Sequence, residues 1–156
     1  MTTGDYTSEF LATELAELEL TSFSAAEAVA LGLLATDRAI EGNLPIIIEV
    51  HHLGRLAYRA ALPGSIPDSD DWLVRKRRTV DRYQRSTLAT KVKYEERGTD
   101  FNTSTGLSEL EYAAHGGGIP IIVRHVGVVG GFYASGLPEV EDHQFLVACL
   151  RDLRAS

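Results

Sequence analysis

The stretch PIIIEVHHLGRLAYRAA, residues 45–61, decides the fold class. β-Branched residues follow a proline that is compatible with the edge of a strand, so a strand is predicted over residues 45–50. Leu53-Gly54 predicts a tight turn, and the alternation after it predicts a second strand over residues 55–61. Two strands joined by so short a turn pair as an antiparallel hairpin.

A second region rich in glycine and β-branched residues predicts another hairpin. It reads GGGIPIIV over residues 116–123 and VGVVGGFYAS over residues 126–135, with a bend at Arg124-His125. Neither hairpin contains a segment long enough for a βαβ crossover. We therefore predict one α+β domain over residues 1–156, in which an antiparallel sheet of two hairpins is flanked by helices.

Five helices are expected around these hairpins. Apolar residues at helical spacing place them over about residues 8–20, 25–41, 68–85, 87–97 and 139–153. Ser24 and Glu27 have the spacing of a capping box, and Asp68 is a good N-cap for the third helix. Residues 98–110 are expected to be irregular. The wide apolar surface of the second helix predicts that it is central and buried: Val29, Leu33, Leu34 and Ile40.

Length and composition exclude several classes of protein. The chain has 156 residues, a mass of 17.0 kDa and a single cysteine, Cys149, so it has no intramolecular disulfide framework and no CxxC motif. It has no apolar run of the length that spans a membrane. The first ten residues have neither a basic start nor an apolar segment, which argues against a signal peptide. We expect a cytoplasmic protein that does not associate with membranes.

Charge is distributed unevenly along the chain. Residues 1–49 contain nine carboxylates and one arginine, whereas residues 75–93 contain eight basic residues and one aspartate. The net charge of −7 repels phosphate, so nucleic acid is not an expected partner. The basic segment leaves a small anion, an acidic partner or a neighbouring subunit as candidates. Glutamates such as Glu14 and Glu17 are expected to be solvated on their helix.

One lysine interrupts the apolar face of the third helix. At about 100° per residue, Lys76 lies about 40° from Trp72 and falls between Trp72 and Val80. The other basic residues of the helix point outward: Arg78, Arg82 and Arg85. A lysine in an apolar stripe snorkels to solvent, pairs with a carboxylate or lines a site. All three explanations remain open, and we favour the site.

Neither the histidines nor the glycines form a known catalytic or cofactor motif. His51 and His52 are adjacent in a strand, so their side chains point to opposite faces and cannot share a metal ion. His115 and His143 are candidate metal ligands, although no HExxH spacing is present. The run over residues 116–118 leads into a strand and not a helix, so it lacks the dipole of a phosphate-binding loop. The favoured explanation of this glycine run is that its backbone packs closely against a neighbouring segment.

Three segments resemble the signatures of a known family. LPGSIPDSDDWLVRK, residues 62–76, resembles the W-x-x-R-K segment of one branch of the GlcG/HbpS-like haem-degrading-domain family. YAAHGGGIP, residues 112–120, and SGLPEVEDH, residues 135–143, resemble the two other signatures of that branch. The resemblance extends in order from about residue 8 to residue 153. It implies a profilin-like α+β fold, homo-oligomers built from dimers, and haem as a ligand.

The combined prediction is a cytosolic, homo-oligomeric module that binds a small anionic ligand, with haem implied by the resemblance. The expected ligand-binding residues are Trp72, Arg75, Lys76, His115, Gly116 and Gly117. His115 and His143 are nominated as axial or metal ligands, and because iron requires a neutral imidazole, haem affinity should weaken in acid. The alternatives are an adaptor that acts through protein partners and a metal-assisted enzyme using His115, His143 and Asp142. No catalytic residue is assigned.

Overall fold

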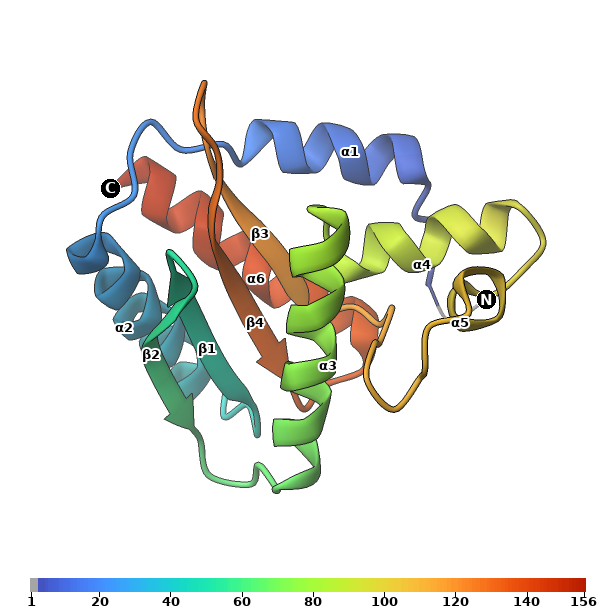
Figure 1. Cartoon of the computed structure of the whole chain (residues 1–156). Helices are drawn as coiled ribbons and strands as arrows, with labels where there is room; N and C mark the ends of the chain where they lie inside the picture. Colours follow the sequence, from blue (N-terminus) through green and yellow to red (C-terminus); the bar gives the residue numbers. More distant parts are fainter. Residues whose placement is uncertain (1–2) are drawn as a thin grey trace.

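Both predicted hairpins form and join into one antiparallel sheet with the strand order β2-β1-β4-β3 (Figure 1). The computed structural model describes residues 3–156. Its elements are α1 (Ser8–Glu17), α2 (Ala25–Glu41), β1 (Ile47–His52), β2 (Arg55–Ala61), α3 (Asp68–Tyr83), α4 (Thr87–Glu96), α5 (Phe101–Thr105), β3 (Gly118–Val123), β4 (Gly127–Ser135) and α6 (Glu139–Ala155). The predicted α+β class and antiparallel sheet are confirmed.

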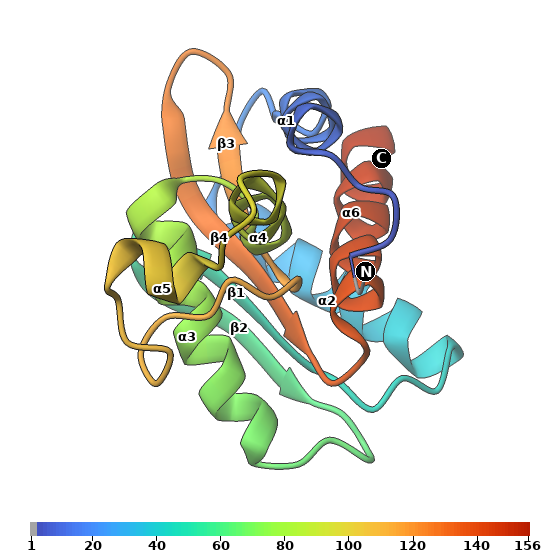
Figure 2. The same ribbon diagram turned by 90° about the vertical axis from the view of Figure 1, so that its right-hand side faces the viewer.

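The sheet is covered by helices on both faces, because both sides of its central strands are apolar. Ile48 and Phe132 point to one face and belong to the main core, under α2 and α6. Ile47 and Tyr133 point to the other face, where they pack against Leu73 of α3. Figure 2 shows α3 on one side of the sheet, and α2 and α6 on the other. This layering places α3 directly over the strand residues of odd number in β1.

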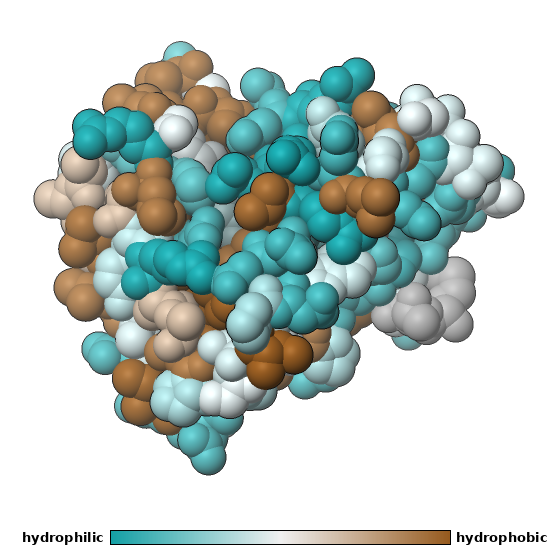
Figure 3. All heavy atoms as spheres, turned by 60° about the horizontal axis from the view of Figure 1, so that its bottom comes forward, coloured by the Kyte–Doolittle hydropathy of each residue, from teal (hydrophilic) through white to brown (hydrophobic). Residues whose placement is uncertain are grey.

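Helix α2 has the predicted bounds and the predicted capping box between Ser24 and Glu27, but it is not buried at the centre. Small residues on one side pack it against the sheet, and the exposed fractions of Leu33 and Ile40 on its other side are 54% and 59%. Figure 3 shows apolar residues gathered on the side of the molecule where α2 and β2 lie. The prediction was wrong because hydrophobic periodicity does not say how many layers cover a helix.

Two local expectations also differ from the structure. Asp68 is the first helical residue of α3 and not its N-cap; the cap position is Pro67, which makes no side-chain cap. The segment expected to be irregular contains the short helix α5, where the side chain of Asp100 accepts a hydrogen bond from the backbone N–H of Thr103. A helix of five residues is too short to produce a periodic pattern.

Within residues 3–156, no helix combines the length and apolar character needed to cross a membrane. The single thiol, Cys149, lies in the main core, where burial raises its pKa to about 12. The thiol therefore stays protonated at neutral pH and packs as a small apolar group. Cys149 is therefore not a candidate site residue.

Candidate functional site

A cavity of about 350 Å³ lies between the first half of α3 and the start of α6. Trp72 and Lys76 reach it from α3, His115 from the loop before β3, and Glu139 and Asp142 from α6. These five residues come from the three segments that carry the family resemblance, over residues 62–76, 112–120 and 135–143. The fold therefore brings together signatures that are far apart in the chain.

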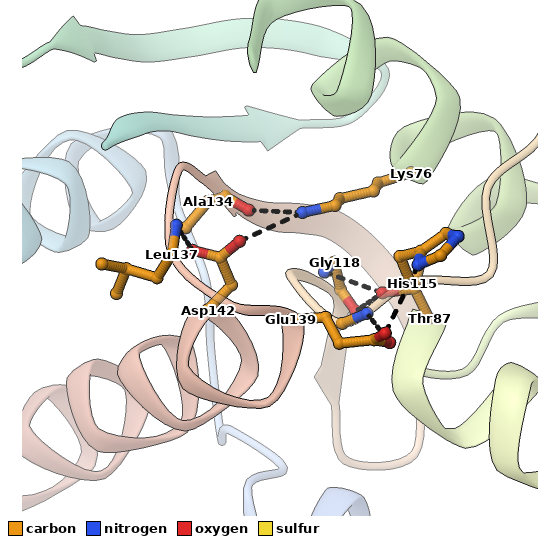
Figure 4. A network of polar contacts seen from close by, with 9 residues as sticks. Lys76, Thr87, His115, Gly118, Ala134, Leu137, Glu139 and Asp142 are labelled. Atoms are coloured by element: carbon orange, nitrogen blue, oxygen red, sulfur yellow. Dashed lines mark hydrogen bonds and ion pairs between the residues drawn. The ribbon is translucent and has the colours of Figure 1, made fainter. Parts of the chain in front are cut away.

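Lys76 is buried in this cavity wall, with an exposed fraction of only 2%. Its Nζ donates a hydrogen bond to the carbonyl oxygen of Ala134 at 3.0 Å and lies 3.4 Å from Oδ2 of Asp142 (Figure 4). Of the three explanations that the sequence left open, snorkelling is wrong. Lys76 pairs with a carboxylate and also lines the cavity.

Burial pushes both partners of this pair toward their neutral forms. It raises the pKa of Asp142 to about 6, although Lys76 and the backbone N–H of Leu137, 3.1 Å away, favour the carboxylate. Burial likewise lowers the pKa of Lys76, against the attraction of Asp142. The Asp142 carboxyl can therefore take up a proton at mildly acidic pH, which would leave the lysine charge without its partner.

His115 is held in a defined orientation at the edge of the cavity, with a side chain that is 43% exposed. Its Nδ1 lies 3.5 Å from Oε2 of Glu139, and its ring meets Trp72 edge to face at a centroid distance of 5.0 Å. Among residues 3–156, its Nε2 has no hydrogen-bond partner. The site thus presents an imidazole with one nitrogen engaged and the other available.

Glu139 is the residue that contacts Nδ1 of His115. The same carboxylate accepts hydrogen bonds from Nζ of Lys91 at 2.6 Å and from the backbone N–H of Gly116 at 3.3 Å. Burial by itself would raise the pKa of Glu139, but hydrogen bonds with His115 and Lys91 lower it to about 2. Glu139 therefore stays ionised and favours a proton on the His115 nitrogen that faces it.

The glycines before β3 allow the backbone to approach α6 and Lys76 closely. A methyl group at Gly116 would collide with the carbonyl oxygen of Glu139. Gly117 has a φ of +124°, and a methyl group there would collide with the Ala134 carbonyl and the Lys76 amine. Neither glycine contributes to the cavity wall itself, and their ligand-binding role stays a prediction.

Two other predicted site residues lie outside the cavity wall. The guanidinium of Arg75 packs over the Trp72 ring, 4.1 Å from its centroid, so it supports a lining residue. His143 is 1% exposed, and its Nε2 forms a hydrogen bond of 2.7 Å with Oε1 of Glu14 on α1. In the part of the chain that is described, no three His, Cys, Asp or Glu residues group to hold a metal ion. The metal-ligand roles of His115 and His143 stay predictions.

Sequence reasoning missed two carboxylates. Glu14 was expected to be solvated, which is wrong: it is buried against His143. Glu139 lies in the last predicted helix and in the resembling segment over residues 135–143, but no role at His115 is predicted for it, although it contacts that imidazole. A histidine within the apolar positions of that helix was the one available signal for Glu14, because a buried imidazole needs a polar partner. No local pattern indicates that Glu139 faces His115.

Comparisons with known proteins find a matching sequence family, related sequences and solved structures with the same fold. A sequence family described as "Haem degrading protein HbpS-like" matches residues 23–151. The UPF0303 protein SCO2848 of Streptomyces coelicolor is 44% identical over 128 residues, which are 82% of this chain and 81% of the relative. The crystal structure of the Ybr137w protein is similar with a TM-score of 0.89 and 25% identity, covering 97% of this chain and 90% of that one. A PduOC–haem complex shares the fold, with a TM-score of 0.65 and 17% identity over 82% of this chain and 94% of that one.

Proposed function

The chain belongs to the family of HbpS-like haem-degrading proteins, and from that premise we propose that it is a small-molecule-binding module that takes haem at the cavity between α3 and α6. The resemblance to this family is confirmed. The family description and the structural neighbour that is a haem complex support haem as the ligand. The observation that carries the proposal is the orientation of His115.

The residues of the cavity suit haem chemically. An iron-ligating histidine commonly donates its second ring N–H to a carboxylate, and Glu139 stands at Nδ1 of His115 in that role. His115 would therefore hold the iron through Nε2, and the Trp72 ring would offer an apolar surface. When bound, haem supplies a redox-active iron.

Titration of the purified protein with haemin tests this proposal. We expect a saturable Soret shift for the wild type, and for His115→Ala a shift that is absent or at least about tenfold weaker in affinity. The matched control is His125→Asn, at an exposed turn position between β3 and β4 where φ is +67° and asparagine is tolerated. Equal affinity for the His115→Ala protein would contradict the role of His115.

A second candidate ligand for the same cavity is a small anion other than haem, favoured by the buried charge of Lys76. Because the pKa of Asp142 is raised to about 6, acid would protonate the carboxyl and leave Lys76 free to attract an anion. Anion affinity should then rise as the pH falls through 6, whereas binding of iron by an imidazole should weaken in acid. Calorimetric titration with benzoate above and below pH 6 tests for the anion site, and the pH dependence distinguishes it from binding of haem iron. Benzoate affinity that does not change with pH would contradict the anion role of the lysine.

We also propose that the chain forms homo-oligomers built from dimers, as the family resemblance implies. The exposed apolar residues of α2, Leu33 and Ile40, support this because such surfaces mark interaction sites. Light scattering should give a mass above 17.0 kDa, and Leu33→Glu should lower it. The control Leu110→Glu, at a more exposed apolar residue outside α2, should not. A wild-type particle of 17.0 kDa would overturn this proposal.

A further inference from the structure

A second cavity, of about 520 Å³, lies at the other end of α3. Its floor is formed by the sheet, with His51 from β1 and Tyr133 from β4. Arg77, Asp81 and Gln84 line it from the second half of α3 and the residue after the helix. It shares no lining residue with the cavity at His115, so the two are distinct candidate sites.

The floor contains the side chain of Tyr133, which is buried as a whole although its hydroxyl group is not among the fully buried polar atoms. Tyr133 is 1% exposed, and its hydroxyl forms no hydrogen bond with any of residues 3–156. Gly131 makes room for it, since a side chain at that position would collide with the hydroxyl. Burial raises the pKa of Tyr133, so the group stays protonated and is a hydrogen-bond donor toward the cavity. A hydroxyl group that lines a cavity and has no protein partner is available to donate to an acceptor that enters the cavity.

Beside this hydroxyl, a chain of ion pairs fixes the ring of His51. Nε2 of His51 lies 2.9 Å from Oε1 of Glu49, and Arg59 bridges Glu49 to Asp70. The His51 ring meets the Tyr133 ring edge to face at 5.5 Å. Although burial opposes it, hydrogen bonds from His51 and Arg59 lower the pKa of Glu49. An ionised Glu49 keeps the proton on Nε2, so Nδ1 of His51 is left as an acceptor.

The helix side of the cavity carries one charge of each sign. Arg77 and Asp81 are four residues apart and therefore lie on the same face of α3, about 6 Å apart at Cβ. Within residues 3–156 neither side chain forms an ion pair, with the other or with any further residue. A simple anion would be repelled by Asp81 and a simple cation by Arg77. A ligand with both charges would satisfy the two together.

We infer that this cavity is a second ligand site and that it takes a zwitterionic amino acid. Arg77 and the Tyr133 hydroxyl bind the carboxylate, and Asp81 binds the ammonium group. Nδ1 of His51 accepts a further hydrogen bond from the ammonium. The apolar rim at Leu53 and Val128 leaves room for an aliphatic side chain. Recognition therefore depends on the two charges of the ligand being present in one molecule.

Calorimetric titration with glycine, L-leucine and L-glutamate tests the inference directly. At least one of these should bind saturably, and for L-leucine the analogues 4-methylpentanoate and isopentylamine, each lacking one charge, should bind at least about tenfold more weakly. Tyr133→Phe removes only the hydroxyl and should weaken binding of the amino acid about tenfold. Arg77→Gln should weaken it at least as much. Arg78→Gln, at the exposed neighbouring position, is the matched control and should bind like the wild type.

The outcome is distinguishable from that of the haem proposal. His115→Ala should leave amino acid binding unchanged, and Tyr133→Phe should leave the haemin spectrum unchanged. Saturable binding by none of the three amino acids would overturn the inference and leave the haem proposal standing. Equal affinity for 4-methylpentanoate and L-leucine would overturn it as well, and so would wild-type affinity in both the Tyr133→Phe and Arg77→Gln proteins. Melting curves of both variants confirm that each is folded.

Discussion

Replacing Lys76 by methionine should lower the free energy of unfolding strongly near pH 8 and only weakly near pH 5. Methionine keeps most of the volume of the lysine stem, so the packing around the side chain is preserved. The ammonium group is lost, and with it the ion pair to Asp142 and the hydrogen bond to the Ala134 carbonyl. The carboxyl of Asp142 is then left buried without an opposite charge.

The magnitude follows from the burial of this pair. Breaking a buried ion pair from one side costs about 3–5 kcal/mol. The pKa of Asp142 is about 6 with the lysine present, against 3.8 as its ordinary value, and without the lysine it rises further. A raised pKa favours the folded state below the ordinary value and loses that contribution as the pH rises through the folded value. The loss in the variant should therefore grow above pH 6, by up to about 1.4 kcal/mol per pH unit, until the pH passes the pKa of the unpaired carboxyl.

Urea denaturation at both pH values measures these differences. The double variant Lys76→Met/Asp142→Asn should recover part of the stability near pH 8, because no charge is then stranded. The control Lys93→Met, on α4, should change stability by no more than about 0.5 kcal/mol. Lys93 stands near Arg85 and Arg97, which lower its pKa, so no attraction is lost. A Lys76→Met protein as stable as the wild type near pH 8 would refute the reasoning.

Three further substitutions test other contacts. Glu139→Gln should make the protein lose less stability in acid, as urea denaturation at several pH values would show. The pKa of Glu139 is about 2 in the folded state against an ordinary value of 4.5. Its carboxylate therefore stabilises the folded state by up to about 3 kcal/mol above pH 4.5, and this stabilisation is lost as the pH falls toward 2. Gly32→Ala should lower the melting temperature and reduce the free energy of unfolding by about 1–3 kcal/mol. The added methyl group would collide with the Tyr58 ring, which outweighs the higher helix propensity of alanine. Glu14→Ala should cost about 1–3 kcal/mol in urea denaturation, because it removes the hydrogen-bond partner of the buried His143.

Each of these expectations has its own contrary result. Glu17→Ala, an exposed position on α1, is the control for Glu14→Ala, and equal losses in the two would show that the buried pair contributes nothing. A Gly32→Ala protein that melts above the wild type would mean that the Tyr58 ring moves aside without loss. Unchanged acid sensitivity in Glu139→Gln would place the titrating groups elsewhere.

The sequence by itself determined the features that depend on neighbours within one helix or one hairpin. A run of β-branched residues, a short turn and an alternating segment were enough to predict β1, β2 and their hairpin, because two strands joined by a tight turn pair with each other. The capping box at Ser24 and Glu27 placed the start of α2 for the same local reason. The place of Lys76 on the apolar face of α3 followed from helical periodicity, which is a property of successive turns of one helix, whereas the sequence left open whether its amine is buried.

Only the tertiary structure decided what each buried polar side chain faces. Lys76 and Asp142 are 66 residues apart, and Glu14 and His143 are 129 apart, so no local pattern could pair them. The placement of His51 beside Tyr133 required the register between β1 and β4. The exposure of Leu33 required knowing that, within residues 3–156, nothing covers the outer side of α2. Hydrophobic periodicity is read along one element, whereas these contacts depend on strand order and on which helix crosses which face.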